Sequence, residues 1–123
     1  MSPGRSYREL VAGQKAMDLA EATYRLASQL PERERFGLWS QLTRAAASVP
    51  MNIAEGRGRQ RSREFANFVS IARVSLAELD TAIEMCVRLG YLNREDTSAM
   101  DALADEVGRM LTTLSGRLRN TTA

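Results

Sequence analysis

Four arginines at alternating positions are the residues of this sequence best suited to chemistry with an anion. This arginine turn lies in the glycine-containing run between Glu55 and Glu64 and consists of Arg57, Arg59, Arg61 and Arg63. The planar guanidinium of arginine pairs well with phosphate, while cations near the start of a helix oppose the helix dipole. Two interpretations stay open: the turn binds the phosphates of nucleic acid, or it is a solvated turn held by scattered acids.

Phosphate contacts by the arginine turn predict binding without sequence preference and with a steep dependence on salt. No aromatic residue interleaves with the four arginines, so the pattern does not indicate base stacking. The end of the chain supplies a second candidate surface, because residues 107–123 hold three arginines and no acid: Arg109, Arg117 and Arg119.

Seven polar residues on two predicted helices form the other pattern that could make a site. These are Gln41, Arg44, Ser48, Asn52 and Glu55, with Ser75 and Glu78. The first five recur every three or four residues and therefore stack on one helix face. Because buried polar side chains need partners, we expect Arg44 and Glu55 to be largely buried and paired. Three interpretations stay open: a structural network that fixes helix register, a ligand or catalytic pocket, and a network at a subunit interface.

Catalysis has little support in this sequence, which contains no histidine. That absence removes the commonest general base and metal ligand, and with them the Glu-x-x-His pairs of di-iron bundles. Gly56 and Gly58 are not followed by the Gly-Lys-Ser/Thr of a phosphate loop. The single cysteine, Cys86, lies in an apolar run, which favours a core residue over a reactive thiol. We expect no enzyme, with no catalytic residue, metal, cofactor or small-molecule substrate.

The composition is that of one globular domain. The chain has 123 residues, of which 44% are hydrophobic and 26% charged, with a net charge of +2. No apolar run approaches the ~20 residues that cross a bilayer, and no signal-peptide core is present at the start. We expect a cytoplasmic protein without membrane contact and a single domain over residues 1–123. Its ordered core covers about residues 6–119, with disorder expected at 1–5 and 120–123.

Four helices are predicted from the spacing of apolar residues, and no stretch alternates as a strand would. The predicted ranges are Ser6 or Gly13 to Leu30, Glu34 to Gly56, Ser62 to Leu89, and Asn93 to Leu118. Because the connections are short, we expect an all-α, antiparallel, up-down-up-down four-helix bundle.

Prolines and capping residues set the predicted helix ends. Pro31 ends the first helix, Ser62 and Gly90 are the N-cap and left-handed C-cap of the third, and Asn93 caps the fourth. Pro50 lies inside the apolar pattern of the second helix. It should kink that helix rather than end it, because one carbonyl loses its hydrogen-bond partner while the pattern continues.

The third predicted helix is apolar over roughly 200° of its circumference, about twice the ~100° of one core-facing stripe. One stripe comprises Phe65, Phe68, Ala72, Leu76, Leu79, Ile83 and Cys86, and a second comprises Ile71, Val74, Ala82, Met85 and Leu89. Two interpretations stay open: this helix is central in its own bundle, or it also packs against another subunit.

The motifs of this chain also carry a family resemblance. The most specific is the run Gln41–Gly56, and shorter ones are Gln14–Leu19, Glu64–Ala72, Ser75–Leu79 and Arg88–Tyr91. Together they resemble a bacterial family of four-helix bundle proteins encoded by intervening sequences in large-subunit ribosomal RNA genes. That family is similar to the accessory variability protein of diversity-generating retroelements. The resemblance spans about residues 7–118, with departures at Gly13, where many members have Trp, and at Arg73–Val74, which replaces a more usual Gly.

The resemblance implies a homo-oligomer, a ring of five bundles, without enzyme activity. For the retroelement relatives it implies a basic surface that binds nucleic acid and a reverse transcriptase. We therefore expect a non-enzymatic oligomer that binds RNA or DNA non-specifically through the arginine turn. The alternative is a protein-binding scaffold or accessory subunit, for example of a reverse transcriptase, docked by acidic residues at 95–106 and the apolar flank of the third helix.

Overall fold

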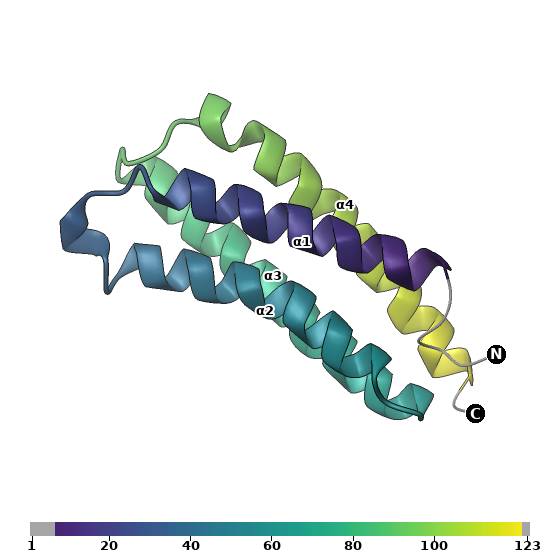
Figure 1. Cartoon of the computed structure of the whole chain (residues 1–123). Coiled ribbons are helices and arrows are strands. Elements are labelled where there is room, and N and C mark those ends of the chain that lie inside the picture. Colours follow the sequence, from purple (N-terminus) through teal and green to yellow (C-terminus); the bar gives the residue numbers. More distant parts are fainter. Residues whose placement is uncertain (1–6, 122–123) are drawn as a thin grey trace.

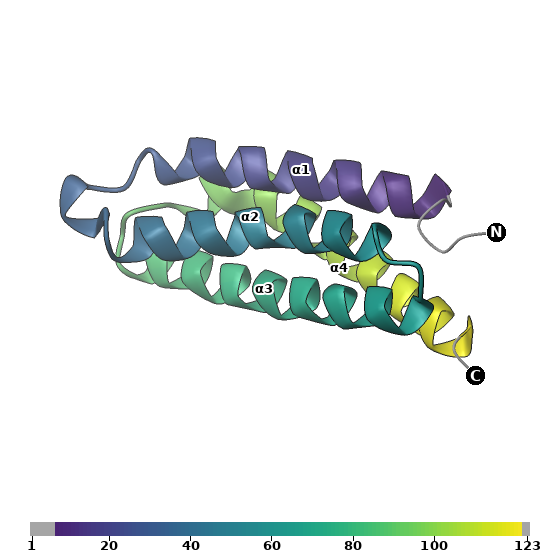
Figure 2. The same ribbon diagram turned by 60° about the horizontal axis from the view of Figure 1, so that its bottom comes forward.

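The computed structural model describes residues 7–121 and confirms a four-helix fold. The helices are α1 (Tyr7–Ala27), α2 (Leu38–Arg57), α3 (Ser62–Arg88) and α4 (Arg94–Thr121), with a short 3-10 helix, η2 (Glu32–Glu34), before α2. Each long helix packs against the next one along the chain, and α4 closes the bundle against α1 (Figures 1 and 2). No strand occurs within the described range, and none of its helices is long and apolar enough to cross a membrane.

Local signals set two helix ends as predicted. Gly90 follows the end of α3 with a φ of 80°, which suits glycine because it has no Cβ. The N–H of Tyr91 donates to the carbonyl of Cys86 at 2.9 Å, and the N–H of Gly90 donates to that of Val87 at 3.0 Å, which together form a Schellman motif. At the start of α4, Asn93 Oδ1 accepts the N–H of Asp96 at 2.8 Å, as an N-cap does.

Two predicted helix starts were wrong. Ser62 is not the N-cap of α3 but its first residue; Arg61 takes the N-cap position with extended backbone and no side-chain cap. Helix α2 starts at Leu38 instead of Glu34, with Gly37 at the N-cap position, and the Glu34 side chain binds the first N–H of the helix. Its Oε1 accepts the N–H of Leu38 at 3.1 Å and its Oε2 accepts the Tyr91 hydroxyl at 2.9 Å. The bond from the Leu38 N–H, followed by the bond from the Tyr91 hydroxyl, holds the pKa of Glu34 below its usual value.

The described residues test only part of the prediction about which residues are ordered. Helix α4 continues through residue 121, past the predicted limit of 119. Residues 1–5 and 122–123, for which disorder was expected, lie outside the described residues.

Pro50 is buried inside α2, which runs unbroken from Leu38 to Arg57. The kink at Pro50 stays a prediction.

A close helix contact lies where α2 ends against the start of α3. A Cβ added to Gly56 would meet Phe65 Cδ1 at 2.6 Å and Phe68 Cβ at 3.0 Å. Phe65 is fully buried there, so its ring cannot move away without opening the core. Glycine is therefore required at position 56 by contact with α3, since Gly56 itself has helical backbone.

A polar contact joins the same two helices at mid-length. The hydroxyls of Ser48 and Ser75 are hydrogen bonded at 2.7 Å. Asn52 donates through Nδ2 to the Ser48 hydroxyl at 2.9 Å and to the Ser48 carbonyl at 2.8 Å. Ser75 is buried, so this contact satisfies a hydroxyl inside the bundle and favours one register of α2 on α3.

Replacing Gly56 with Ala should destabilise the protein by about 1–3 kcal/mol, because the new methyl group overpacks the contact with Phe65. The matched control is Gly13→Ala in α1, where an added Cβ meets nothing within 4 Å. That change should stabilise by about 0.5–1 kcal/mol, since alanine has less backbone freedom to lose. Denaturant unfolding of both variants measures the difference; equal effects would mean that α2 and α3 are farther apart than described.

Candidate nucleic-acid interface

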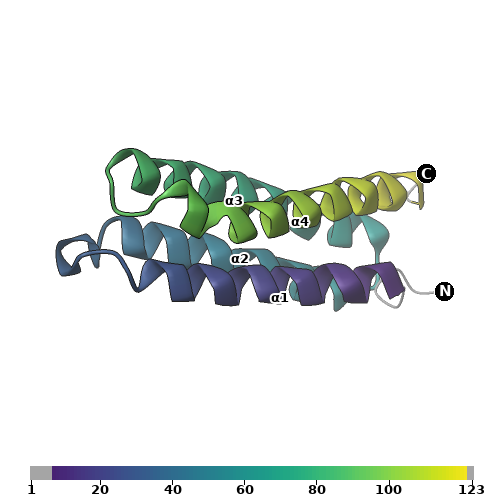
Figure 3. The same cartoon turned by 90° about the horizontal axis from the view of Figure 1, so that it is seen from above.

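The antiparallel topology gathers the arginines of three separate segments at one end of the bundle. The start of α1, the connection from α2 to α3 and the end of α4 lie at the same end in three views (Figures 1, 2 and 3). We call this the basic end. Its arginines are Arg8, Arg57, Arg59, Arg61, Arg63, Arg109, Arg117 and Arg119. The two candidate basic surfaces predicted from the sequence thus lie at the same end of the molecule.

The four residues of the arginine turn have different surroundings. Arg61 and Arg63 are exposed, and neither forms an ion pair with another residue in the range 7–121. Arg57 is partly buried and engaged in contacts of its own. Arg59 donates to Glu55 at 2.8 Å, lies 3.8 Å from Glu64, and stacks over a phenylalanine ring, with its guanidinium carbon 4.9 Å from the ring centroid.

Arg59 therefore belongs to the structure of the turn. The ring beneath it is that of Phe68, on α3, while Glu55 is on α2, so Arg59 ties the end of one helix to the start of the next. Arg59 is held by acids, as the second interpretation expects, while Arg61 and Arg63 are exposed. Phosphate binding by the arginine turn stays a prediction.

Charges at the opposite end of the bundle largely compensate one another. Arg94 donates to both carboxylate oxygens of Glu84, at 3.1 and 3.0 Å, and Arg88 donates to the same carboxylate at 3.0 Å. These bonds, chiefly that from Arg94, lower the pKa of Glu84 to about 2. The surface shared by α3 and α4 is acidic. The pKa of Asp80 there is raised mainly by burial and further by the negative charges of Asp101 and Asp105. At the basic end, by contrast, Arg61 and Arg63 are exposed and form no ion pair within residues 7–121.

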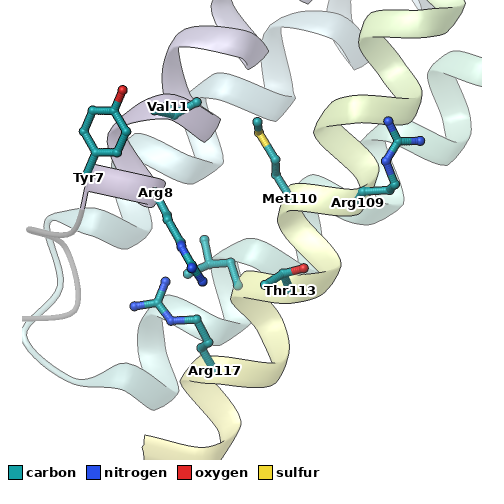
Figure 4. Close-up of a pocket in the computed structure, with 8 residues that line it drawn as sticks. Tyr7, Arg8, Val11, Arg109, Met110, Thr113 and Arg117 are labelled. Atoms are coloured by element: carbon teal, nitrogen blue, oxygen red, sulfur yellow. The ribbon is translucent and has the colours of Figure 1, made fainter.

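A cavity of about 360 Å³ lies within the basic end, between the start of α1 and the end of α4. Figure 4 shows Arg8 of α1 and Arg117 of α4 extending toward one another, with Met110 pointing toward α1. The other lining residues are Tyr7, Val11, Arg109, Thr113 and Leu114. Sequence analysis missed this cavity, because its walls are about a hundred residues apart along the chain. The expected antiparallel pairing of the first and last helices is the signal that could have found it.

The polar row is joined only in part. Ser48, Asn52 and Ser75 are linked by the hydrogen bonds given above, whereas the other four residues are exposed: Gln41, Arg44, Glu55 and Glu78. The expectation that Arg44 and Glu55 are buried was wrong for the single chain. Both lie at the outer edge of the helix contact, where water solvates the charge, and Glu55 pairs with Arg59.

The second apolar stripe of α3 is left uncovered by its own bundle except at Ala82, which is buried. We define the apolar face by Ile71, Val74, Met85 and Leu89, whose side chains are between 47% and 59% exposed. The residues of the first stripe are buried, apart from half-buried Phe68. A central position in its own bundle therefore does not account for the width of the arc. A groove of about 750 Å³ runs beside this face, between α2 and α3.

Cys86 lies in the first stripe and is fully buried. Burial, followed by the charge of Glu34, raises the pKa of its thiol to about 11. A thiol with so high a pKa is protonated near neutrality and is a poor nucleophile, as expected of a core residue.

Comparison with known proteins supports the fold and identifies the family. No curated protein matches the chain. A solved structure of a protein with unknown function from the S23 ribosomal protein family of Bacteroides thetaiotaomicron superposes with a TM-score of 0.82 at 23% identity. The match covers 89% of this chain and 98% of that one, and it shows the shared fold. Residues 8–113, which include six of the eight arginines of the basic end, match the 23S rRNA-intervening sequence proteins, and the chain belongs to that family.

Proposed function

We propose that this protein is a non-enzymatic, oligomeric binding protein of the cytoplasm that holds RNA or DNA by its phosphates. The observation that carries the proposal is the basic end, where the start of α1, the α2–α3 connection and the end of α4 lie together and where Arg61 and Arg63 are exposed without an ion pair within residues 7–121. Nucleic acid presents a regular line of negative charge, and its neutralisation by arginines releases counterions. The family name refers to ribosomal RNA genes as the place where such proteins are encoded, and it is consistent with binding to nucleic acid.

Arg61 and Arg63 are the phosphate contacts best placed within the arginine turn. They are exposed, and the turn that carries them is held in shape by Arg59 through its contacts with Glu55 and Phe68. Such contacts do not distinguish one base from another, so binding is expected to be non-specific. A rigid turn with two exposed guanidinium groups loses less conformational entropy on binding than a flexible arginine tail.

The apolar face of α3 supports self-association. Four large apolar side chains that stay half exposed along one helix form an unusual surface for an isolated monomer. A further copy of the chain would bury them. The number five rests on the family resemblance alone. Several basic ends held in one assembly could engage a single strand together, and such avidity increases affinity by ~10²–10⁴ where the geometry permits.

A second candidate function is that of an accessory subunit for another protein, such as the reverse transcriptase of a retroelement. The observation that favours it is the same apolar face, which a partner protein could cover instead of a further copy. In that case the arginines would be solvated, and the purified protein would bind no nucleic acid. A reverse transcriptase gene beside the coding gene would favour this candidate.

Changing Arg61 and Arg63 together to Gln should weaken binding to RNA and DNA and reduce the slope of log K against log salt by about two. Fluorescence anisotropy over a range of salt concentrations measures both quantities. The matched control changes Arg35 and Arg88 to Gln, two exposed arginines at the opposite end. Equal loss in both double variants, or no binding by the wild-type protein at low salt, would contradict the proposal.

Changing Val74 and Met85 to Glu should dissociate the oligomer, because it places charges in an interface that would be dry. The control is Met17→Glu, which alters a side chain of similar exposure on α1. Light scattering coupled to gel filtration gives the mass of each assembly. A wild-type monomer at micromolar concentration, or a Val74→Glu/Met85→Glu variant of unchanged mass, would refute self-association through the apolar face.

A further inference from the structure

The most exposed large apolar side chain in the described part of the chain is that of Phe36, in the connection from η2 to α2. The side chain is 90% exposed, and the connection that carries it extends past the ends of the neighbouring helices (Figures 1 and 2). Single exposed apolar residues are ordinary on protein surfaces, so exposure alone does not indicate a contact. Phe36 differs from them in the rigidity of its connection and in the presence of a matching groove on the same chain.

The connection is held in place by contacts on both sides of Phe36. Glu34 accepts a hydrogen bond from the Tyr91 hydroxyl at 2.9 Å. The guanidinium carbon of Arg33 lies 5.6 Å from the centroid of the Tyr91 ring. A Cβ added to Gly37 would meet Glu34 Oε1 at 2.6 Å, so the backbone passes close to this carboxylate. A ring presented on so fixed a connection loses little conformational entropy when a contact buries it.

The groove between α2 and α3 offers an apolar site that can take this ring. Its volume is about 750 Å³. Its apolar lining comprises two buried residues and three members of the apolar face: Leu38, Ala82, Val74, Met85 and Leu89. The Phe36 ring of the same chain is not part of the lining and stays in water. The groove is therefore free to receive a side chain from elsewhere.

The groove and the Phe36 ring lie on different sides of α2. The guanidinium carbon of Arg35 is 5.5 Å from the centroid of the Phe36 ring, and Arg35 lines a pocket with Trp39 and the end of α1. The ring is thus next to the α1 side of α2, whereas the groove is on the α3 side. Both are at the end of the bundle where α2 begins. Copies related by rotation about an axis along the bundle therefore bring ring and groove to the same level.

The charges beside the two surfaces are complementary. Glu78 lines the groove and forms no ion pair with another residue of the range 7–121. Arg35, next to the ring, pairs loosely with Glu32 at 3.7 Å. Opposite charges at the rim of an interface orient the contact but add little affinity, so the aromatic ring carries the binding.

We propose that Phe36 of one copy inserts into the groove of a second copy of this chain. The inference rests on the self-association proposed above and names the two surfaces that meet. Because these surfaces differ, the contact is heterologous: each copy offers its ring to one neighbour and its groove to another. Repetition of such a contact closes into a ring of copies when the rotation between them permits it. An aromatic anchor in a desolvated pocket supplies a large share of the affinity of many interfaces.

The first test replaces Phe36 with Ser and follows the mass of the assembly by light scattering coupled to gel filtration over a range of protein concentrations. Loss of the ring should raise the dissociation constant by about thirtyfold, as expected of a hot-spot residue. Phe36→Trp keeps an aromatic ring and should assemble as wild type does. The matched control is Met51→Ser, which removes an exposed apolar side chain from the other half of α2. Because these side chains are exposed, circular dichroism should show unchanged helix content in all three variants.

A mixing experiment tests whether the ring enters the groove. Phe36→Ser lacks the ring but keeps its groove, whereas Val74→Glu/Met85→Glu keeps the ring but carries charges in its groove. Each variant alone should be monomeric at micromolar concentration. Their equimolar mixture retains one intact contact, so native mass spectrometry should detect a heterodimer and nothing larger.

The outcomes separate this inference from the proposed self-association. A wild-type monomer at micromolar concentration overturns both. A wild-type oligomer that Phe36→Ser leaves unchanged in affinity overturns the inference alone, as does a Phe36→Ser monomer that forms no heterodimer in the mixture. Equal weakening by Phe36→Ser and Met51→Ser would likewise overturn it, because the effect would not depend on the groove.

Discussion

The tight contact between the end of α2 and the start of α3 positions most of what is distinctive in this protein. Gly56 lies against Phe65 and Phe68 so closely that a single methyl group would not fit. This contact brings the two helices together just before the chain turns, which leaves only a short connection, residues 58–61, between them. Arg59 then stacks on Phe68 from the outside and pairs with Glu55. The packing of two aromatic rings on a glycine thus determines where the exposed arginines of the turn project.

The same antiparallel arrangement separates charge in space. An arginine turn in the middle of the sequence and an arginine-rich last helix meet because alternate helix ends lie together in a bundle of this topology. At the opposite end, Glu84 pairs with both Arg88 and Arg94 and offsets one of their two positive charges. The molecule therefore has a modest net charge of +2 and a strongly basic end. Such a distribution favours an oriented approach to a polyanion.

Much of the fold could be predicted from the sequence because its signals are local. Apolar spacing located all four helices, and Gly90 and Asn93 end and begin helices through hydrogen bonds within a few residues. The start of α2 was misplaced because Glu34 is held by Tyr91, which lies 57 residues further along the chain. Ser62 was taken for a cap because its residue type favours that role, whereas the adjacent Arg61 takes the extended conformation.

Prediction of the candidate site was less complete, for a geometric reason. A helical wheel gives the direction of a side chain but not the depth of its burial. It therefore put Ser48 and Ser75, which are hydrogen bonded, in one polar set, but placed Arg44 and Glu55 inside the bundle. The cavity could not be read from the spacing of residues, because Arg8 and Arg117 meet only through the packing of α1 on α4.

Ultraviolet cross-linking of the wild-type protein to a single-stranded oligonucleotide, followed by peptide mass spectrometry, tests the central claim most directly. Nucleic acid bound at the basic end should cross-link to peptides from residues 7–11, 57–63 and 109–119. Peptides from η2 and from the connection between α3 and α4, at the opposite end, should carry no cross-links. Cross-links confined to that opposite end, or spread evenly over all four helices, would contradict binding through the basic end.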